Sequence, residues 1–426
     1  MFTFVKNEIV MRIFQPMYLL LLLTLHSALF AQQSKEAYLK ENGMALSASY
    51  TFPKNMKIIG FGAFHGSAKT EDAELLIVES LIKNNGLSYY FPETDCSIAH
   101  YFDQYLTTGD EALLKDLIET YGTRVPQERT IEVFNKWKKL KALNDKLPNN
   151  KKIKVLGADP IVTYKYTYKH LLSLISIPAQ WKAALQLQET VAKDTTDYSP
   201  YYESYSKNQL KIFVADYNAN IEKYKPLIID KPLFDYIIAT IKVSFDNTYH
   251  REKEMYNNYL NLVKLYKFED KLQFFRLGFA HLLKTKEGKA RSLFCMLADN
   301  NIYPKNEIVS ILGYLTKSEV IWDEVYDANG EYRSYTTSGD EGIGDSPTEY
   351  FRGIDALKAQ KKSDLTIFRM NAQNTPYNKP ACVDMVEIIS VEKPIDYGTT
   401  VTTDFIDYAL LISNSAASRS IYSVKK

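Results

Sequence analysis

The chain has 426 residues, enough for one large domain with an insertion or for two domains. Hydrophobic residues make up 46% and charged residues 24%, a balance that excludes an intrinsically disordered chain. The formal net charge is +1 and no long run of one sign occurs, so the sequence offers no electrostatic basis for binding nucleic acid or an acidic membrane surface.

Residues 1–31 have the pattern of a secretory signal peptide. Lys6 and Arg12 give a basic start, residues 17–30 form an apolar stretch, and small residues lead to a predicted cleavage after Ala31. The apolar stretch is short for a membrane span, and no cysteine follows it as a lipid anchor would require. We therefore expect an exported protein, periplasmic or secreted, with no membrane anchor after cleavage.

The cysteines give no disulfide framework and no metal site. Cys96, Cys295 and Cys382 are odd in number and far apart, and no C-x-x-C pair occurs. We expect them to be free thiols, or at most to form one bridge.

From residue 57 to residue 159 the pattern alternates between strand and helix. Continuous apolar runs are typical of buried parallel strands, and segments with an apolar face and a glycine at the end are typical of helices. This alternation predicts an α/β fold with a mainly parallel sheet flanked by helices. The predicted strands are 57–64, 87–91 and 152–159, and the predicted helices are 70–85 and 130–147.

The middle of the chain has a different pattern. Residues 166–268 are rich in tyrosine, lysine and leucine with few strand signals, and they predict a helical insertion or cap. We expect the α/β core to comprise 32–165 and 269–426, with a hairpin turning at Asn329-Gly330. The strands predicted in the second part are 272–280, 307–315, 364–370, 384–390 and 408–413.

Polar residues follow several of the predicted strands. His65 follows the first strand, Glu93 the second and Asp159 the third, while His281 follows the strand at 272–280. Because ligands bind at the carboxyl ends of parallel strands, we expect these side chains to converge at one edge of the sheet. A histidine that titrates near neutral pH and a carboxylate that orients it are what activation of a water molecule requires.

Other chemistries have weaker support. No G-x-S-x-G motif is present, which argues against a serine hydrolase, and Cys96 near Glu93 is a weak candidate nucleophile. No H-E-x-x-H motif occurs, although His65, Glu93 and His281 are three residues of the types that bind zinc. A single histidine in a strand-end turn is more often structural than catalytic. A catalytic role for His65 is therefore supported only together with the other polar residues at the strand ends.

Several motifs in order resemble the erythromycin esterase family. "GFGAFHGS" and "LSYYFPETDCSIAHYFDQYLTTGD" resemble the family's G-E-x-x-H-G turn and its strand ending in glutamate. "TIEVFNKWKKLKALN", "VLGAD", "FRLGFAHLLK" and "TDFIDYALLIS" resemble later segments, and "REKEMYNNYL" is similar to the R-D-x-x-M-x-x-N helix through Arg251, Met255 and Asn258. The resemblance extends over about residues 55–415.

The resemblance implies a hydrolase that uses histidine-activated water against an ester or lactone, with a small-molecule substrate and no cofactor or metal. His65 matches the general base, Glu93 the strand-end acid, and His281 the second histidine of H-N-x-H. Asp159 matches the G-x-D acid. Arg251 matches an arginine that is a candidate for holding an anionic group of the substrate or a developing oxyanion.

Three family positions differ in this chain. Gly62 replaces a glutamate, Gly278 replaces the first histidine of H-N-x-H, and Glu74 replaces an arginine nine residues after the base. The resemblance therefore predicts a partly degenerate site. Lys69 and Arg276 are the nearby candidates to replace the lost cation.

Two alternatives stay open. His65 and Glu93 also resemble the G-x-x-H and E motifs of TraB/Tiki-like metalloproteases, which would use these residues and His281 around a divalent metal. The two glycines at catalytic positions equally suit a non-catalytic exported binding protein of the same fold. The sequence does not give the oligomeric state.

Overall fold

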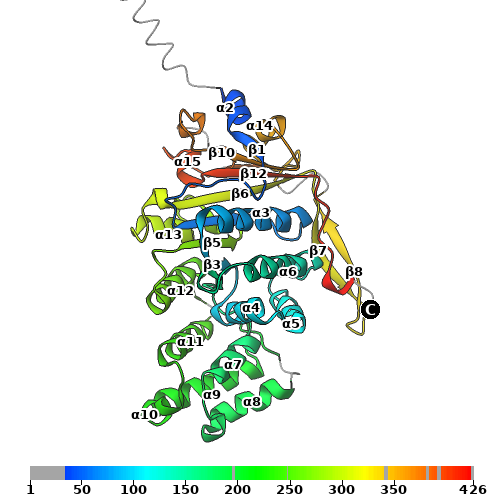
Figure 1. Ribbon diagram of the computed structural model, residues 1–426. Helices are drawn as coiled ribbons and strands as arrows, with labels where there is room; N and C mark the ends of the chain where they lie inside the picture. The colour runs from blue at the N-terminus through cyan, green and yellow to red at the C-terminus, as the bar shows by residue number, and fades with distance from the viewer. Residues whose placement is uncertain are drawn as a thin grey trace, which may run out of the picture.

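The computed structural model describes residues 34–193, 197–246, 248–339, 344–379, 383–390 and 395–423. An eight-stranded sheet runs through the molecule, in the order β1-β10-β12-β6-β2-β5-β3-β4, with helices on both faces (Figure 1). The predicted α/β class is confirmed. The strands are β1 (Gly43–Ala45), β2 (Ile58–Gly62), β3 (Leu87–Pro92), β4 (Lys154–Val155), β5 (Leu272–Leu277), β6 (Ile308–Thr316), β10 (Leu365–Arg369) and β12 (Tyr408–Ser413).

Neighbouring strands from β12 to β4 are parallel, whereas β10 is antiparallel to both β12 and β1. Every residue of β2, β5, β6 and β12 is buried. A parallel sheet needs cover on both faces, which explains why these strands are apolar throughout rather than alternating. The carboxyl ends of β2, β5, β3 and β4 consequently lie along one edge of the sheet.

Successive side chains of each strand enter two separate cores. Ile59 and Phe61 of β2 belong to a core with the helices α3 (Ala68–Asn85), α4 (Cys96–Thr108), α5 (Glu111–Tyr121) and α6 (Ile131–Asp145). Ile58 faces the other core, which includes α2 (Lys35–Asn42), α12 (Arg251–Tyr266) and α13 (Leu293–Asp299). Each core therefore anchors one set of helices to the same strands.

Among the residues that the structure describes, the chain between β4 and β5 forms helices joined by loops, with one isolated antiparallel bridge between Ile175 and Ile228. In Figure 1 most of them gather beyond the β3 end of the sheet. The helical character predicted for this segment agrees with these elements, while its treatment as a separate unit from 166 to 268 stays a prediction. The helices are α7 (Tyr164–Ser173), α8 (Lys182–Lys193), α9 (Tyr205–Ala219), α10 (Ile221–Tyr224), α11 (Lys231–Ser244) and α12.

The second part of the chain holds one correction. The predicted strand at 384–390 does not enter the main sheet; only β11 (Ile388–Ile389) forms, and it pairs with β9 (Tyr350–Phe351). Met385 has a φ of 67°, a left-handed conformation that turns the backbone and ends any extended run there. The predicted hairpin is confirmed as β7 (Val320–Tyr326) and β8 (Tyr332–Ser338), while the helices α14 (Ile354–Ala359) and α15 (Thr402–Phe405) complete the fold.

The predicted signal peptide and Cys382 lie outside the described residues. Cys96 and Cys295 are buried free thiols. Within the described part of the chain, no helix combines the length and the apolar character needed to cross a membrane.

A close backbone contact places the β4 end beside the β3 end. The amide of Leu156 donates to the carbonyl of Tyr90, and the amide of Asp159 donates to the carbonyl of Thr94. Between them, a Cβ on Gly157 would lie 2.5 Å from the Thr94 carbonyl oxygen and 2.4 Å from that of Asp95. Only glycine lets the two segments approach this closely.

We expect Gly157→Ala to lower the free energy of unfolding by about 1–3 kcal/mol, because the new methyl group meets two backbone carbonyls that cannot move aside. Urea unfolding measures the change. Gly86→Ala is the control. Its Cβ would meet nothing within 4 Å, so the expected loss is only the cost of placing alanine at a φ of 72°, about 1 kcal/mol. Equal losses in the two variants would contradict the close contact.

Candidate active site

The predicted site residues lie together at the carboxyl edge of the sheet. His65 follows β2, Glu93 follows β3 and Asp159 follows β4, while His281 lies in a short 3-10 helix, η5 (Phe279–Leu282), after β5. Arg251, the first residue of α12, contacts the latter three. Sequence reasoning therefore located the group, although the role of each residue stays a prediction.

His65 is oriented by a carboxylate that the sequence did not indicate. Its Nδ1 bonds Glu128 of η1 (Pro126–Glu128), a 3-10 turn between α5 and α6, while its Nε2 lies 3.6 Å from Oε2 of Glu93. The side chain of His65 is 19% exposed and that of Glu128 is 9% exposed. A buried carboxylate on Nδ1 holds the imidazole in one orientation and leaves Nε2 for chemistry.

His281 has a similar arrangement on the other side of Glu93. Its Nδ1 bonds Glu252, and its Nε2 lies 3.6 Å from Oε1 of Glu93. The backbone amide of Gly278 donates to the second oxygen of Glu93. Two imidazoles, each backed by a glutamate, thus flank one central carboxylate.

Arg251 fixes this carboxylate. Its Nη2 donates to Glu93 at 2.6 Å and to Asp159 at 2.6 Å, and its Nε donates to Asp159 at 2.9 Å. Arg251 Nη1 lies 3.1 Å from Nε2 of His281, and Arg124 donates to Asp159 at 2.8 Å. The side chain of Asp159 is fully buried between the two arginines and pairs with both, and Glu93 supplies the second negative charge beside Arg251.

The ion pairs set the protonation of the site. Burial opposes the charged form of His65, but Glu128 and Glu93 outweigh it and raise the pKa of His65 to about 9. Burial likewise acts against charge on His281, yet Glu252 and Glu93 raise its pKa to about 9. The two histidines hold the pKa of Glu93 well below its usual range despite burial. In the resting site His65 is consequently protonated at neutral pH.

The two glycines at resembled positions differ in the space around them. A Cβ on Gly62 would lie 3.0 Å from the Cα of Phe279 and 2.9 Å from Leu282, so this backbone has no room for a glutamate. A Cβ on Gly278 would lie 3.5 Å from Oε2 of Glu93, facing the site. Position 62 is closed to a side chain, whereas a Cβ at position 278 would fit in ordinary contact with Glu93 and His281.

Glu74, which stands where the resemblance expects an arginine, belongs to a buried charge cluster. Lys136 pairs with Glu74 at 2.8 Å and with Glu71 at 2.6 Å, and Arg276 Nε lies 3.3 Å from Glu74. Lys69 pairs with Asp364 instead and does not line the cavity described next. Of the two candidate replacement cations, only Arg276 lies beside His65.

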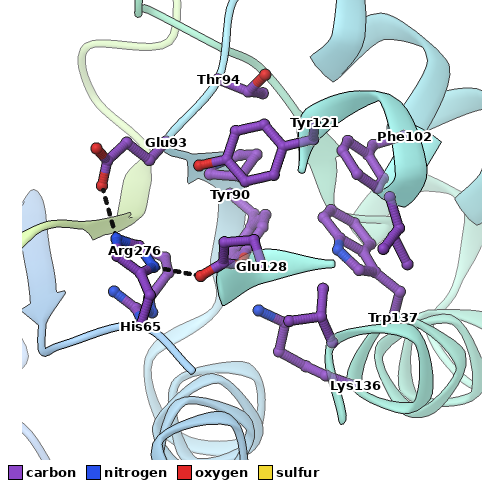
Figure 2. A pocket seen from close by; sticks show the side chains of 13 residues that line it. His65, Tyr90, Glu93, Thr94, Phe102, Tyr121, Glu128, Lys136, Trp137 and Arg276 are labelled. Carbon is purple, nitrogen blue, oxygen red and sulfur yellow. Dashed lines mark hydrogen bonds and ion pairs between the residues drawn. The ribbon is translucent and has the colours of Figure 1, made fainter. Parts of the chain in front are cut away.

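A small cavity adjoins His65 (Figure 2). The centres of water molecules can occupy about 30 Å³ of this cavity, which is enough for one or two waters. Polar groups and aromatic rings share its wall. The lining residues are His65, Tyr90, Pro92, Glu93, Thr94, Phe102, Ile118, Tyr121, Glu128, Val133, Lys136, Trp137 and Arg276.

The geometry gives little support to two alternatives, a metal site and a cysteine nucleophile. Among the described residues, no group of three or more histidine, cysteine, aspartate or glutamate side chains is arranged to hold a metal ion. Cys96 is buried, and burial raises the pKa of its thiol to about 12, which opposes formation of a nucleophilic thiolate.

Sequence reasoning missed Glu128, Glu252 and Arg124. Glu128 lies in a turn between two helices, where no strand-end rule applies. Arg124 precedes the same turn. Glu252 had one available signal, since it follows Arg251 at the start of a predicted helix.

Comparison with known proteins shows the fold and no family. No protein-family model and no curated protein matches the chain. A Bacillus cereus protein of solved structure is 16% identical, with a TM-score of 0.57, covering 91% of this chain and 98% of its own. A succinoglycan biosynthesis protein is 14% identical, with a TM-score of 0.59 and the same coverage.

An erythromycin esterase, solved as a histidine-to-asparagine mutant in its open conformation, is 12% identical. Its TM-score is 0.53, and the match covers 86% of this chain and 92% of the esterase. At these identities the likeness concerns the fold alone. The chain thus has a distant fold relationship to an erythromycin esterase over most of its length.

Proposed function

We propose that this chain is a hydrolase of an ester or lactone, in which His65 activates water. The observation that carries the proposal is the His65–Glu128 pair, which leaves Nε2 beside Glu93 and next to a water-sized cavity. A carboxylate on one nitrogen and a second nitrogen that faces a water-sized space is the arrangement of a histidine general base, once the proton that Nε2 shares with Glu93 has left. The fold relationship to an esterase supports the same reaction class.

In the proposed reaction, neutral His65 takes a proton from water through Nε2, and the water oxygen adds to the carbonyl carbon. The bond from that carbon to the alkoxy oxygen then breaks, and the imidazolium returns its proton to the departing alkoxide. Glu128 stabilises the imidazolium that forms in between. Glu93 stays ionised because its pKa is low, and Arg251 holds it in place.

His65→Ala is expected to lower kcat/KM by about 10²-fold or more on whichever ester or lactone of a substrate panel the protein hydrolyses, because the general base is lost. His100→Ala is the matched control, since His100 is a surface histidine that does not line the cavity. Hydrolysis that is indifferent to His65 would rule out the proposal. Absence of turnover on the whole panel would favour a binding protein of this fold.

The pH profile gives an independent check of the base. Because the base must be neutral and the pKa of His65 is about 9, kcat/KM should rise roughly tenfold per pH unit up to that value and level off above it. Glu128→Gln removes the charge that raises this pKa, so its plateau should begin at a lower pH and lie about 10²-fold lower in rate.

Glu79→Gln serves as the control for this experiment, because Glu79 forms an ion pair with Lys83 on α3 and does not line the cavity beside His65. Its profile should overlay that of the wild type. If Glu128→Gln has the same pH dependence of kcat/KM as the wild type, a group other than His65 acts as the base.

We further propose that the protein is exported after cleavage of its first 31 residues, on the pattern of Lys6, Arg12 and the apolar run before Ala31. N-terminal sequencing of protein from the native host should begin at Gln32. A chain that keeps its first residues would contradict export by this route.

A further inference from the structure

Tyr121 directs an unpartnered hydroxyl into the cavity beside His65. The residue ends α5 and is 8% exposed. Its hydroxyl makes no hydrogen bond to another described residue and keeps a small area open to solvent. Figure 2 shows the hydroxyl of Tyr121 pointing toward the space bordered by Glu93 and Glu128. Burial, together with these two carboxylates, raises the pKa of Tyr121 well above its usual range, so the phenol keeps its proton.

Arg276 brings a second unsatisfied donor to the same cavity. Its Nη1 donates to the carbonyl of Leu277 at 3.0 Å, whereas Nη2 has no hydrogen-bond partner among the described residues although Arg276 is only 3% exposed. Figure 2 places Arg276 next to His65. Buried donors without partners are rare in native proteins, and ordered water is their commonest partner.

The charges around the cavity favour water over an anion. The cations are already paired, Lys136 with Glu71 and Glu74, and His65 with Glu128. An additional anion would be repelled by these glutamates and by Glu93, which is ionised. A water molecule is neutral, can accept hydrogen bonds from Tyr121 and Arg276, and can donate one to neutral His65. The cavity has the volume of one or two waters.

We propose that the cavity holds the attacking water, bound by the hydroxyl of Tyr121 and by Nη2 of Arg276 beside Nε2 of His65. The inference rests on the proposed hydrolase function. Both donors point their protons at the water oxygen, which leaves its own protons for His65 and a neighbouring carboxylate. For the attack, the oxygen gives up one of these two hydrogen bonds, so that the freed lone pair forms the bond to the carbonyl carbon. One water proton passes to Nε2 of neutral His65 in this step, and that proton later reaches the leaving alkoxide.

Tyr121→Phe tests the proposal, since it removes one hydroxyl and keeps the ring. We expect kcat to fall about ten- to a hundredfold on the ester that the wild type hydrolyses, with KM changed less than threefold. The pH at which the rate levels off should stay at that of the wild type, because a neutral phenol contributes no charge to His65. Tyr101→Phe is the matched control: Tyr101 lies on α4, outside the cavity lining.

Two further measurements distinguish a wet cavity from a dry one. A high-resolution crystal structure should show an ordered water within hydrogen-bond distance of Tyr121 and Arg276 that is absent or displaced in Tyr121→Phe. If the cavity holds water, the Tm of Tyr121→Phe should fall, because the variant loses the hydrogen bond between the tyrosine hydroxyl and that water. If the cavity is dry, removal of the unpaired hydroxyl should leave the Tm equal or higher.

The outcomes separate the two proposals. If His65→Ala abolishes turnover while Tyr121→Phe keeps the wild-type kcat and the cavity is empty, the water site is wrong and the hydrolase function stands. If His65→Ala leaves turnover intact, the hydrolase function fails, and the role of Tyr121 fails with it.

Discussion

The guanidinium of Arg251 is the contact on which the site depends. It joins the first residue of α12 to carboxylates after β3 and β4, with donor distances of 2.6 Å to Glu93 and to Asp159. These groups are partly or fully removed from water, so removing one partner would leave the others as uncompensated buried charges. The helical segment before β5 is thereby held against the strand ends. The same link fixes Glu93 between the two histidines.

Around that fixed carboxylate, the site differs from the motif that its sequence resembles, yet a carboxylate still contacts the histidine. The sequence motif lacks the carboxylate expected at position 62, and the close approach of Phe279 shows why no side chain fits there. A carboxylate still reaches the histidine, because the turn between α5 and α6 delivers Glu128 to Nδ1. A lost motif residue therefore need not mean a lost chemical group. At Gly278 the site is contacted by the backbone, since the amide of this glycine binds Glu93.

Much of this could be predicted from residue patterns. The buried runs at β2, β3 and β5 and the parallel topology placed His65, Glu93 and His281 at one edge, since parallel strands share the direction in which they end. The side chains that complete the site could not be found in this way. Glu128 and Tyr121 come from a 3-10 turn and a helix end, and each is an ordinary residue in its local pattern. The packing of α5 and α6 onto the sheet brings them to His65. Arg276, which the sequence offered as a replacement cation, reaches the site because β5 pairs with β2. The prediction of a strand at 384–390 was wrong for a related reason, because the left-handed backbone at Met385 does not change the hydropathy pattern.

The ion pairs of the two histidines link stability to the proposed chemistry with opposite signs. Folding raises the pKa of His65 and of His281 from 6.5 to about 9. Their pairing with glutamates therefore contributes its full stabilisation below about pH 6.5 and loses it as the pH rises through about 9. The same deprotonation turns His65 into a base. A substrate or a bound water that favours the neutral imidazole would lower the pKa of His65, and it would thereby weaken the ion pair with Glu128. The buried position of Glu128 thus stabilises the charged form of the resting site, and the proposed catalysis would require His65 to lose part of that stabilisation.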